Sequence, residues 1–216
     1  MIKRSLALLL SSLAVATATI GFDAEQPIST STFTCLKSSG YSFYISRVHR
    51  SNGAIDSTGV TNIKNAWSGG LSHVDGYIFP CLSPNCPSAT DQAINAVDAL
   101  KNGGTKIGRM WIDVEVYNWP SIQSNNRQFI LDMANKLVEL GCKIGIYSNH
   151  HYWKSIVGTD WTRMSKYQLW WASYNGHADL NHFKAFGGWS KPSIHQYTVD
   201  VAGPCSVGQF DLNYKP

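Results

Sequence analysis

The fold is decided by residues 109–148, which read RMWIDVEVYNWPSIQSNNRQFILDMANKLVELGCKIGIYS. The run at 109–116 is apolar and aromatic, which predicts a strand. In the segment from about 125 to 140, apolar residues recur at three- and four-residue spacing, which predicts a helix that Gly141 ends. Residues 143–148 again have the composition of a strand. This order predicts two neighbouring parallel strands joined by a helix that lies on the sheet.

The same alternation continues on both sides of this unit. Further strands are predicted at 20–23, 43–48, 73–79, 168–173, 193–197 and 209–212. A second amphipathic helix is predicted at 89–100, whereas after Trp171 Gly, Asn and Pro become frequent and the helical period fades. We therefore expect an α/β fold, an irregular TIM-like barrel of eight strands in one domain, with its last strands joined by loops.

The N-terminus has the pattern of a signal peptide. Lys3 and Arg4 precede an apolar run at 6–15, and the small residues 16–18 follow it. A buried N-terminal helix is the alternative, but such a helix would have one polar face, and this stretch has only Ser and Thr as polar residues. We expect cleavage after residue 18, a mature barrel at 19–216, and no membrane anchor after cleavage.

The net charge of the chain excludes some classes of partner. The formal net charge is +4, and it falls to +2 when Lys3 and Arg4 leave with the signal peptide. A balance this mild, without a clustered basic run, argues against nucleic acid as a partner.

Five cysteines, Cys35, Cys81, Cys86, Cys142 and Cys205, suggest disulfides in a secreted chain, with at least one left unpaired. A local bridge could close the turn between Cys81 and Cys86. A zinc site is the rival interpretation, but no second Cys or His pair completes the spacing, and we expect no metal.

Two carboxylates interrupt the strand predicted at 109–116. Asp113 and Glu115 are two residues apart, so on a strand both point to one face. An edge strand with one solvated face would also alternate polar and apolar residues. Here, however, the flanking residues are bulky and aromatic, and a carboxylate buried among them is costly unless it has a partner or a function. The two acids would stand at the C-terminal end of their strand, where barrel enzymes place catalytic groups.

Such a pair suits glycoside cleavage, which needs a protonated acid and a charged partner near the sugar. Asp23, which ends the first predicted strand, holds an equivalent position, and Asp211 joins it if the last strand runs in the fitting direction. Aromatic residues are also frequent, with eight Trp and ten Tyr, and some of Trp111, Trp119, Trp170, Trp171 and Tyr197 would stack on sugar rings while the others fill the core.

In order along the chain, the motifs resemble those of the glycoside hydrolase family 25 lysozymes, the Chalaropsis-type muramidases, and look most like the branch of amoebae and nematodes. The matching residues are Gly21-Phe22-Asp23, Arg47, Gly76-Tyr77, Asp113-Val114-Glu115, Ile146-Tyr147-Ser148, Leu169-Trp170-Trp171-Ala172, Gln196-Tyr197 and Asp211-Leu212-Asn213. One departure follows the first aspartate, where the family usually has a small residue, Ser and an aromatic, and this chain has Ala24-Glu25-Gln26-Pro27.

The resemblance implies a (β/α)5(β)3 barrel that cleaves the β-1,4 bond between N-acetylmuramic acid and N-acetylglucosamine in bacterial peptidoglycan, without a cofactor and as a monomer. It implies Glu115 as general acid, Asp113 as the carboxylate that raises its proton affinity and orients the N-acetyl group, and Asp23 and Asp211 as completing an acidic cluster. The substrate contacts that it implies are Arg47, Tyr77, Tyr147, Trp170 and Tyr197, with Tyr147 suited to hold the acetamido group. Substrate assistance is preferred over an enzyme nucleophile.

Two other functions remain open from the sequence. A glycan-binding or immune-modulating protein could keep the barrel with little catalysis, although both acids are present. A chitinase would also place Asp and Glu two apart on the fourth strand, although Met110, Trp111 and Ile112 stand where chitinases usually have a longer acidic run. A lysozyme could serve antibacterial defence or digestion, outside the cell or in a lysosomal, phagosomal or gut lumen.

Overall fold

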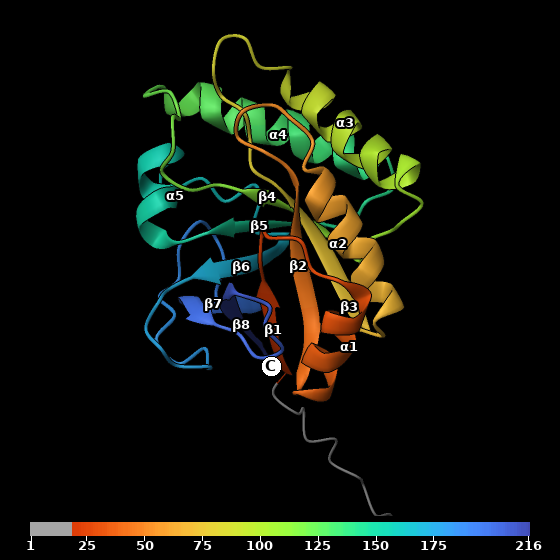
Figure 1. Cartoon of the computed structure of the whole chain (residues 1–216). Helices are drawn as coiled ribbons and strands as arrows, with labels where there is room; N and C mark the ends of the chain where they lie inside the picture. Colours follow the sequence, from red (N-terminus) through yellow and green to blue (C-terminus); the bar gives the residue numbers. More distant parts are fainter. Residues whose placement is uncertain (1–18) are drawn as a thin grey trace, which may run out of the picture.

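The computed structural model describes residues 19–216, in which eight strands close a barrel in sequence order (Figure 1). The strands are β1 (Thr19–Asp23), β2 (Tyr41–His49), β3 (His73–Ile78), β4 (Met110–Asp113), β5 (Ile144–Ser148), β6 (Gln168–Ala172), β7 (Ile194–Ala202) and β8 (Gln209–Lys215). Neighbours from β1 to β7 are parallel, and β8 is antiparallel to both β7 and β1. The signal peptide predicted at residues 1–18 lies outside the described residues.

Each of the first five strands is followed by a helix in the described part of the chain. The helices are α1 (Thr30–Ser38), α2 (Ser57–Ser68), α3 (Ala89–Asn102), α4 (Gln123–Glu139) and α5 (His150–Ile156). Side chains of Ser29, Asp56, Ser88 and Asn149 cap four of them by accepting a backbone N–H of the first turn. In Figure 1 the last strands, drawn in blue, are flanked by loops. The predicted α/β barrel, regular early and irregular late, is confirmed.

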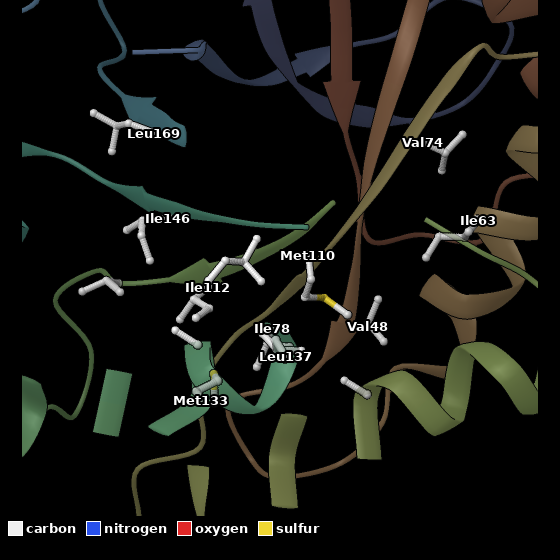
Figure 2. Close-up of a cluster of buried hydrophobic side chains, with 14 of the residues drawn as sticks. Val48, Ile63, Val74, Ile78, Met110, Ile112, Met133, Leu137, Ile146 and Leu169 are labelled. Carbon is white, nitrogen blue, oxygen red and sulfur yellow. The ribbon is translucent and has the colours of Figure 1, made fainter. Parts of the chain in front are cut away.

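The barrel wall separates two apolar layers. The outer layer packs strand residues such as Val48, Ile112 and Leu169 against helix residues such as Met133 and Leu137 (Figure 2). The inner layer fills the middle of the barrel with Phe43, Ile45, Trp111, Tyr147, Trp170, Ala172 and Ile194. Because side chains alternate along a strand, the polar residues before and after this inner layer stand at the two open ends of the barrel.

The fourth strand is shorter than predicted. It ends at Asp113 and not at residue 116, because its pairing with β3 stops at Ile112. The backbone N–H of Val114 still donates to the carbonyl of Tyr147 at 2.9 Å, so the chain stays against β5 for one more residue. Glu115 therefore lies beyond the end of the strand. Strand alternation predicts the direction of the Asp113 side chain but not that of Glu115.

Two disulfides join Cys35 to Cys205 and Cys81 to Cys86, and Cys142 is free. The first links the helix after β1 to the loop before β8, which fixes the closing strand of the barrel beside the first one. The second closes the turn proposed from the sequence. Of the helices described, none has the length and apolar character that crossing a membrane requires.

Candidate active site

A cavity of about 400 Å³ opens at the C-terminal end of the parallel strands. Six carboxylates line it: Asp23, Glu25, Asp113, Glu115, Asp200 and Asp211. No Lys, Arg or His occurs among its lining residues in the described part of the chain. Negative charge is therefore concentrated there, and the wall itself carries no cation.

Asp113 and Glu115 meet in this cavity, as the sequence predicted, although only Asp113 is on the strand. Asp113 is 5% exposed, and burial together with the charge of Glu115 raises its pKa well above the ordinary value. Burial also raises the pKa of Glu115, which is half-buried. One oxygen of Asp113, Oδ1, is buried and has no hydrogen-bond donor among the described residues. The pair can hold a proton at a pH where ordinary carboxyl groups have lost it.

Asp23 is held by two amides. The indole Nε1 of Trp170 can only donate, and it donates to Oδ1 of Asn213 at 2.7 Å. Nδ2 of Asn213 must then face Asp23, and it donates to Oδ1 of that carboxylate at 2.6 Å. Gln196 donates through Nε2 to both oxygens of Asp23, at 3.0 and 3.2 Å. Burial and the charge of Asp211 raise the pKa of Asp23, and these amide donors act in the opposite sense.

The Gln196 amide joins two parts of the cavity. Its Nε2 also reaches Oδ2 of Asp211 at 3.2 Å, so its oxygen must accept, and Tyr147 donates to it at 2.6 Å. The Tyr147 hydroxyl hydrogen is used in that bond, so the hydroxyl of Tyr174, 3.0 Å away, is the donor to Tyr147. Burial raises the pKa of Asp211 to about 6. The network fixes the directions of three side chains without using a cation.

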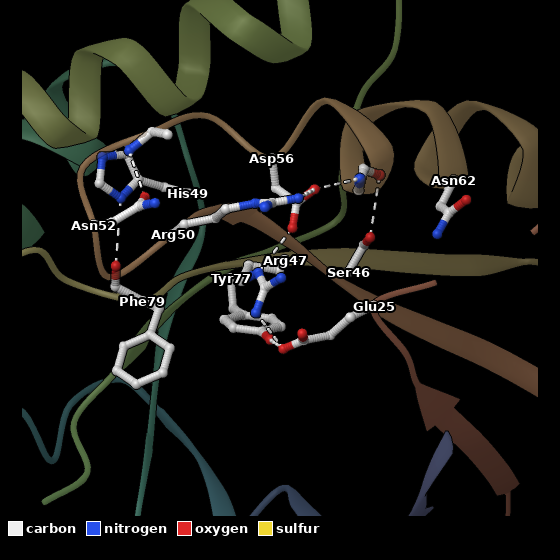
Figure 3. A network of polar contacts seen from close by, with 12 residues as sticks. Glu25, Ser46, Arg47, His49, Arg50, Asn52, Asp56, Asn62, Tyr77 and Phe79 are labelled. Carbon is white, nitrogen blue, oxygen red and sulfur yellow. Dashed lines mark hydrogen bonds and ion pairs between the residues drawn. The ribbon is translucent and has the colours of Figure 1, made fainter. Parts of the chain in front are cut away.

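Arg47 does not line the cavity, and Figure 3 shows the polar contacts that it makes. Its Nε donates to Oδ2 of Asp56 at 2.8 Å, and its Nη1 pairs with Glu25 on the rim. Arg50 binds the other oxygen of Asp56 at 2.9 Å, and these ion pairs hold the pKa of Asp56 below its ordinary value despite burial. Tyr77 donates to Oε1 of Glu25 at 3.3 Å. Glu25, at the position where the sequence departs from the family pattern, is thus the residue that connects Arg47 to the cavity.

The structure separates the residues predicted as substrate contacts. Tyr77, Tyr147 and Trp170 line the cavity together with the four predicted acids. Arg47 lies one layer behind, and Tyr197 does not line the cavity, because inward Gln196 leaves its neighbour on the outer face. Of the other aromatics predicted near strand ends, Trp111 is in the inner layer, whereas Trp119 and Trp171 belong to the outer apolar cluster.

Several lining or supporting residues were not predicted as site residues: Glu25, Phe79, Tyr174, Gln196, Asp200 and Asn213. Gln196 and Asn213 could have been found from strand alternation, because each is a polar residue in an inward position. Tyr174 lies in a loop and has no periodic signal. No group of three or more His, Cys, Asp or Glu between residues 19 and 216 is arranged to hold a metal ion.

Comparisons with known proteins agree with this geometry. A family model described as lysozyme-like protein 1 matches residues 14–197. The chain is 48% identical over 202 residues to lysozyme-like protein 5 of Caenorhabditis elegans, which covers 94% of each chain. It is 38% identical over 216 residues to "Probable GH family 25 lysozyme 2" of Dictyostelium discoideum, covering 99% of this chain and 100% of that protein. The fold is similar to a bacterial lysozyme from Streptomyces coelicolor, with a TM-score of 0.72, 20% identity and 92% coverage of both chains.

Proposed function

Because the chain belongs to the lysozymes of glycoside hydrolase family 25, and is thus a peptidoglycan-degrading glycoside hydrolase, we propose that it cuts the β-1,4 bond between N-acetylmuramic acid and N-acetylglucosamine. The observation that supports this reaction most is the pair Asp113 and Glu115, whose pKa values are both raised in a cavity without a lining cation. Glycoside cleavage requires one carboxyl that keeps its proton and another that carries charge.

Glu115 is the general acid. It is the more exposed of the pair, so a glycosidic oxygen in the cavity can reach it, and burial raises its pKa. A raised pKa keeps a useful fraction of the carboxyl protonated in weakly acidic conditions, from which it donates to the leaving oxygen. The charge of Glu115 in turn raises the pKa of Asp113, because two neighbouring carboxylates resist simultaneous ionisation, so the pair as a whole retains a proton.

Asp113 also orients the substrate. Its Oδ1 is buried and has no donor among the described residues, and an acetamido N–H of the sugar would supply one. That contact would hold the acetamido oxygen toward the anomeric carbon, which is the arrangement needed for substrate assistance. Asp23, held by Asn213 and Gln196, would stabilise positive charge on the sugar ring, with Asp211 next to it.

Tyr147 has a narrower role than the sequence suggested. Its hydroxyl hydrogen goes to Gln196 at 2.6 Å, so toward an acetamido group it offers an acceptor lone pair and its ring, not a donor. Tyr147 packs against Trp170, with ring centroids 4.6 Å apart. The two rings form an aromatic wall on which the bound sugar would rest.

The protein would act outside the cytosol. The basic start, apolar run and small residues of the predicted signal peptide support export, and two disulfides suit an oxidising compartment. The same features fit the extracellular space and a lysosomal, phagosomal or gut lumen, where the enzyme would degrade bacterial walls in defence or in digestion.

The test is the release of reducing sugars from purified peptidoglycan, with chitin in parallel, by the mature protein and its Glu115→Gln variant. We expect activity on peptidoglycan and not on chitin, and a loss of about 10²–10⁴-fold in the variant, the usual effect of removing a general acid. Activity on chitin alone would indicate a chitinase. A folded protein that binds the wall but releases nothing between acidic and neutral pH would be a glycan-binding protein instead.

A further inference from the structure

A second cavity, of about 210 Å³, opens at the opposite end of the barrel, where the parallel strands begin. We call it the basic mouth, because four of its lining residues are His73, Arg109, Lys143 and Lys215. Among the described residues, Asp75 is the only acid that lines it. Its charge is the opposite of that of the catalytic cavity at the other end.

The strand pattern directs these side chains toward the barrel axis. Arg109 comes two residues before inward-facing Trp111, and Lys215 comes two residues after inward-facing Asn213. Lys143 occupies the corresponding position just before β5. The cations are therefore part of the inner face of the barrel, gathered by its closure, and not scattered surface residues.

The three cations of the basic mouth make no direct contact with a carboxylate of the described residues. Arg109, Lys143 and Lys215 take part in no ion pair within the described part of the chain, where Arg47, Arg50, Lys101, Arg127 and Lys136 do. Arg109 is also held in place, because its Nη1 donates to the carbonyl of Ile144 at 2.6 Å. Its guanidinium lies 5.5 Å from the ring of Trp111. Its remaining N–H groups are free to bind a ligand in the cavity.

Asp75 is only a partial counter-ion, because its charge interacts with those of Arg109 and Lys215 without direct contact. Its Oδ2 accepts a hydrogen bond from the indole of Trp111 at 3.0 Å, and it forms no ion pair with a residue that the structure describes. Burial raises its pKa, while the Trp111 hydrogen bond and the charges of Arg109 and Lys215 act in the opposite sense. The basic mouth therefore keeps a net positive charge, of about two units when Asp75 is ionised.

We propose that the basic mouth binds a phosphate group through Arg109, Lys143 and Lys215. Arg109 offers planar, paired donors and the two lysines offer point charges, a combination that suits a tetrahedral oxyanion. Inorganic phosphate carries about one to two negative charges near neutral pH, which matches the net charge of the mouth, and a phosphodiester carries one charge but still offers several oxygens to three cations, which a carboxylate does not. A cavity of about 210 Å³ exceeds several-fold the ~30 Å³ of one water molecule, so it admits a phosphate with part of its hydration.

The phosphate has two possible sources. It can be free inorganic phosphate, or a phosphate that belongs to an anionic polymer attached to a bacterial wall. In the second case the protein would contact the wall at both ends of the barrel, with glycan at the catalytic cavity and polymer at the basic mouth.

The first experiment is a titration of the mature protein with inorganic phosphate against chloride at equal ionic strength, followed by NMR. We expect saturable shifts at the Arg109 amide and the Trp111 indole N–H, which face the basic mouth, and none at the Trp170 indole in the catalytic cavity. The double variant Lys143→Gln/Lys215→Gln should bind at least about tenfold more weakly, because two charge-assisted contacts are lost.

The matched control is Lys166→Gln/Lys191→Gln. It removes the same charge from two exposed lysines that lie just before β6 and β7 and do not line the cavity. Shifts that do not saturate, or an equal loss in the control, would overturn the proposal. Should the first double variant unfold, Lys143→Gln alone keeps the test, since Lys143 is exposed.

A second experiment separates the two sources. Retention of the Glu115→Gln variant is measured on walls with their phosphodiester polymers and on walls from which these were removed, with and without Lys143→Gln/Lys215→Gln. Retention that needs both the polymer and the lysines assigns the site to wall phosphate. Equal retention on both walls, with a positive titration, assigns it to free phosphate. Neither readout requires hydrolysis, so failure of the proposed enzymatic reaction would leave this test intact.

Discussion

The two ends of the barrel share their strands but carry opposite charge. The inward residues run from Arg109, just before β4, through Trp111 to Asp113 at its end, and along the antiparallel β8 they run from Asp211 to Lys215. At ~3.3 Å per residue, the two charged ends of β4 are about 13 Å apart. The apolar inner layer lies between them, so the opposite charges cannot pair.

The unpaired charges at the catalytic end lower the stability of the fold and are needed for its proposed activity. Like charges gathered at one end repel, and a carboxylate taken out of water without a cation is costly. A nearby contrast is Asp56, which is also buried but binds Arg47 and Arg50 and has a lowered pKa. The catalytic cavity thus contains acids that the fold could have neutralised and does not. Neutralising charge there should raise stability while it lowers activity.

The largest effect is expected for Asp113→Asn. Activity on peptidoglycan should fall about 10²-fold or more, since a charge that stabilises the transition state is removed. The melting temperature at pH 7 should rise, because the amide removes a buried charge next to Glu115. The checks are reducing-sugar release and thermal unfolding. A loss of both activity and stability would mean that the carboxylate supports the fold.

The matched change at the other end is Lys143→Gln. Its activity on a short soluble glycan should stay within about twofold of that of the unaltered protein, because the apolar inner layer separates the two ends of the barrel and solvent screens one charge over such a separation. If this variant lost activity as Asp113→Asn does, the two ends could not be regarded as independent.

The sequence predicted these two ends unequally. Strand alternation located Asp113 and Asp23, because a period of two is a local property that a short segment reveals. Glu115 was correctly placed in the cavity, but for an incomplete reason, since the strand ends before it. Tyr197 was predicted as a substrate contact but does not line the cavity. Its neighbour Gln196 points inward, so Tyr197 lies on the outer face of the strand.

The basic mouth was not predicted, although Arg109 and Lys143 have the same alternation as the acids. Each cation alone reads as an ordinary residue at the start of a strand. Only closure of the barrel brings Lys215, from the last strand, next to Arg109 from the fourth. The disulfide between Cys35 and Cys205, 170 residues apart, could not be predicted for the same reason, because a long-range contact produces no periodic pattern in the local sequence.

A second prediction concerns amides at the two ends. Asn213→Leu leaves the indole of Trp170 without an acceptor and removes one of the two amide donors of Asp23, so the free energy of unfolding should fall by about 2–4 kcal/mol. Gln168→Leu, an amide that lines the basic mouth and is exposed, should change it by no more than about 0.5 kcal/mol. Chemical denaturation measures both values. Equal losses would show that the polar network of the catalytic cavity contributes no more to stability than an exposed amide at the basic mouth does.

The third prediction is the pH dependence of stability. Asp23, Asp113, Glu115 and Asp211 have raised pKa values, so the folded state binds more protons than the unfolded chain and stability falls as pH rises from about 4. For Asp211 this fall ends near pH 6, its folded pKa. Asp56 acts in the opposite sense and loses its contribution as pH falls through its lowered pKa.

We therefore expect thermal unfolding to show maximal stability in weakly acidic buffer, between about pH 4 and 6, and a lower melting temperature at pH 7.5. In Asp113→Asn the decline between these pH values should be smaller, since one of the four carboxyls no longer titrates. A profile that rises steadily to pH 7.5 would contradict the raised pKa values on which the acidic cavity depends.

The smallest effect is expected for Asp75→Asn at the basic mouth. The asparagine keeps an oxygen to accept the Trp111 indole hydrogen and removes the one negative charge of the lining. Phosphate should then bind about two- to fivefold more tightly, a modest gain because solvent screens charges near an open cavity. The phosphate titration at constant ionic strength measures it, with the Trp111 indole shift as the check that the side chain has not moved. Weaker binding would mean that Asp75 organises the cations and does not oppose the anion, and the two ends would then differ in more than the sign of their charge.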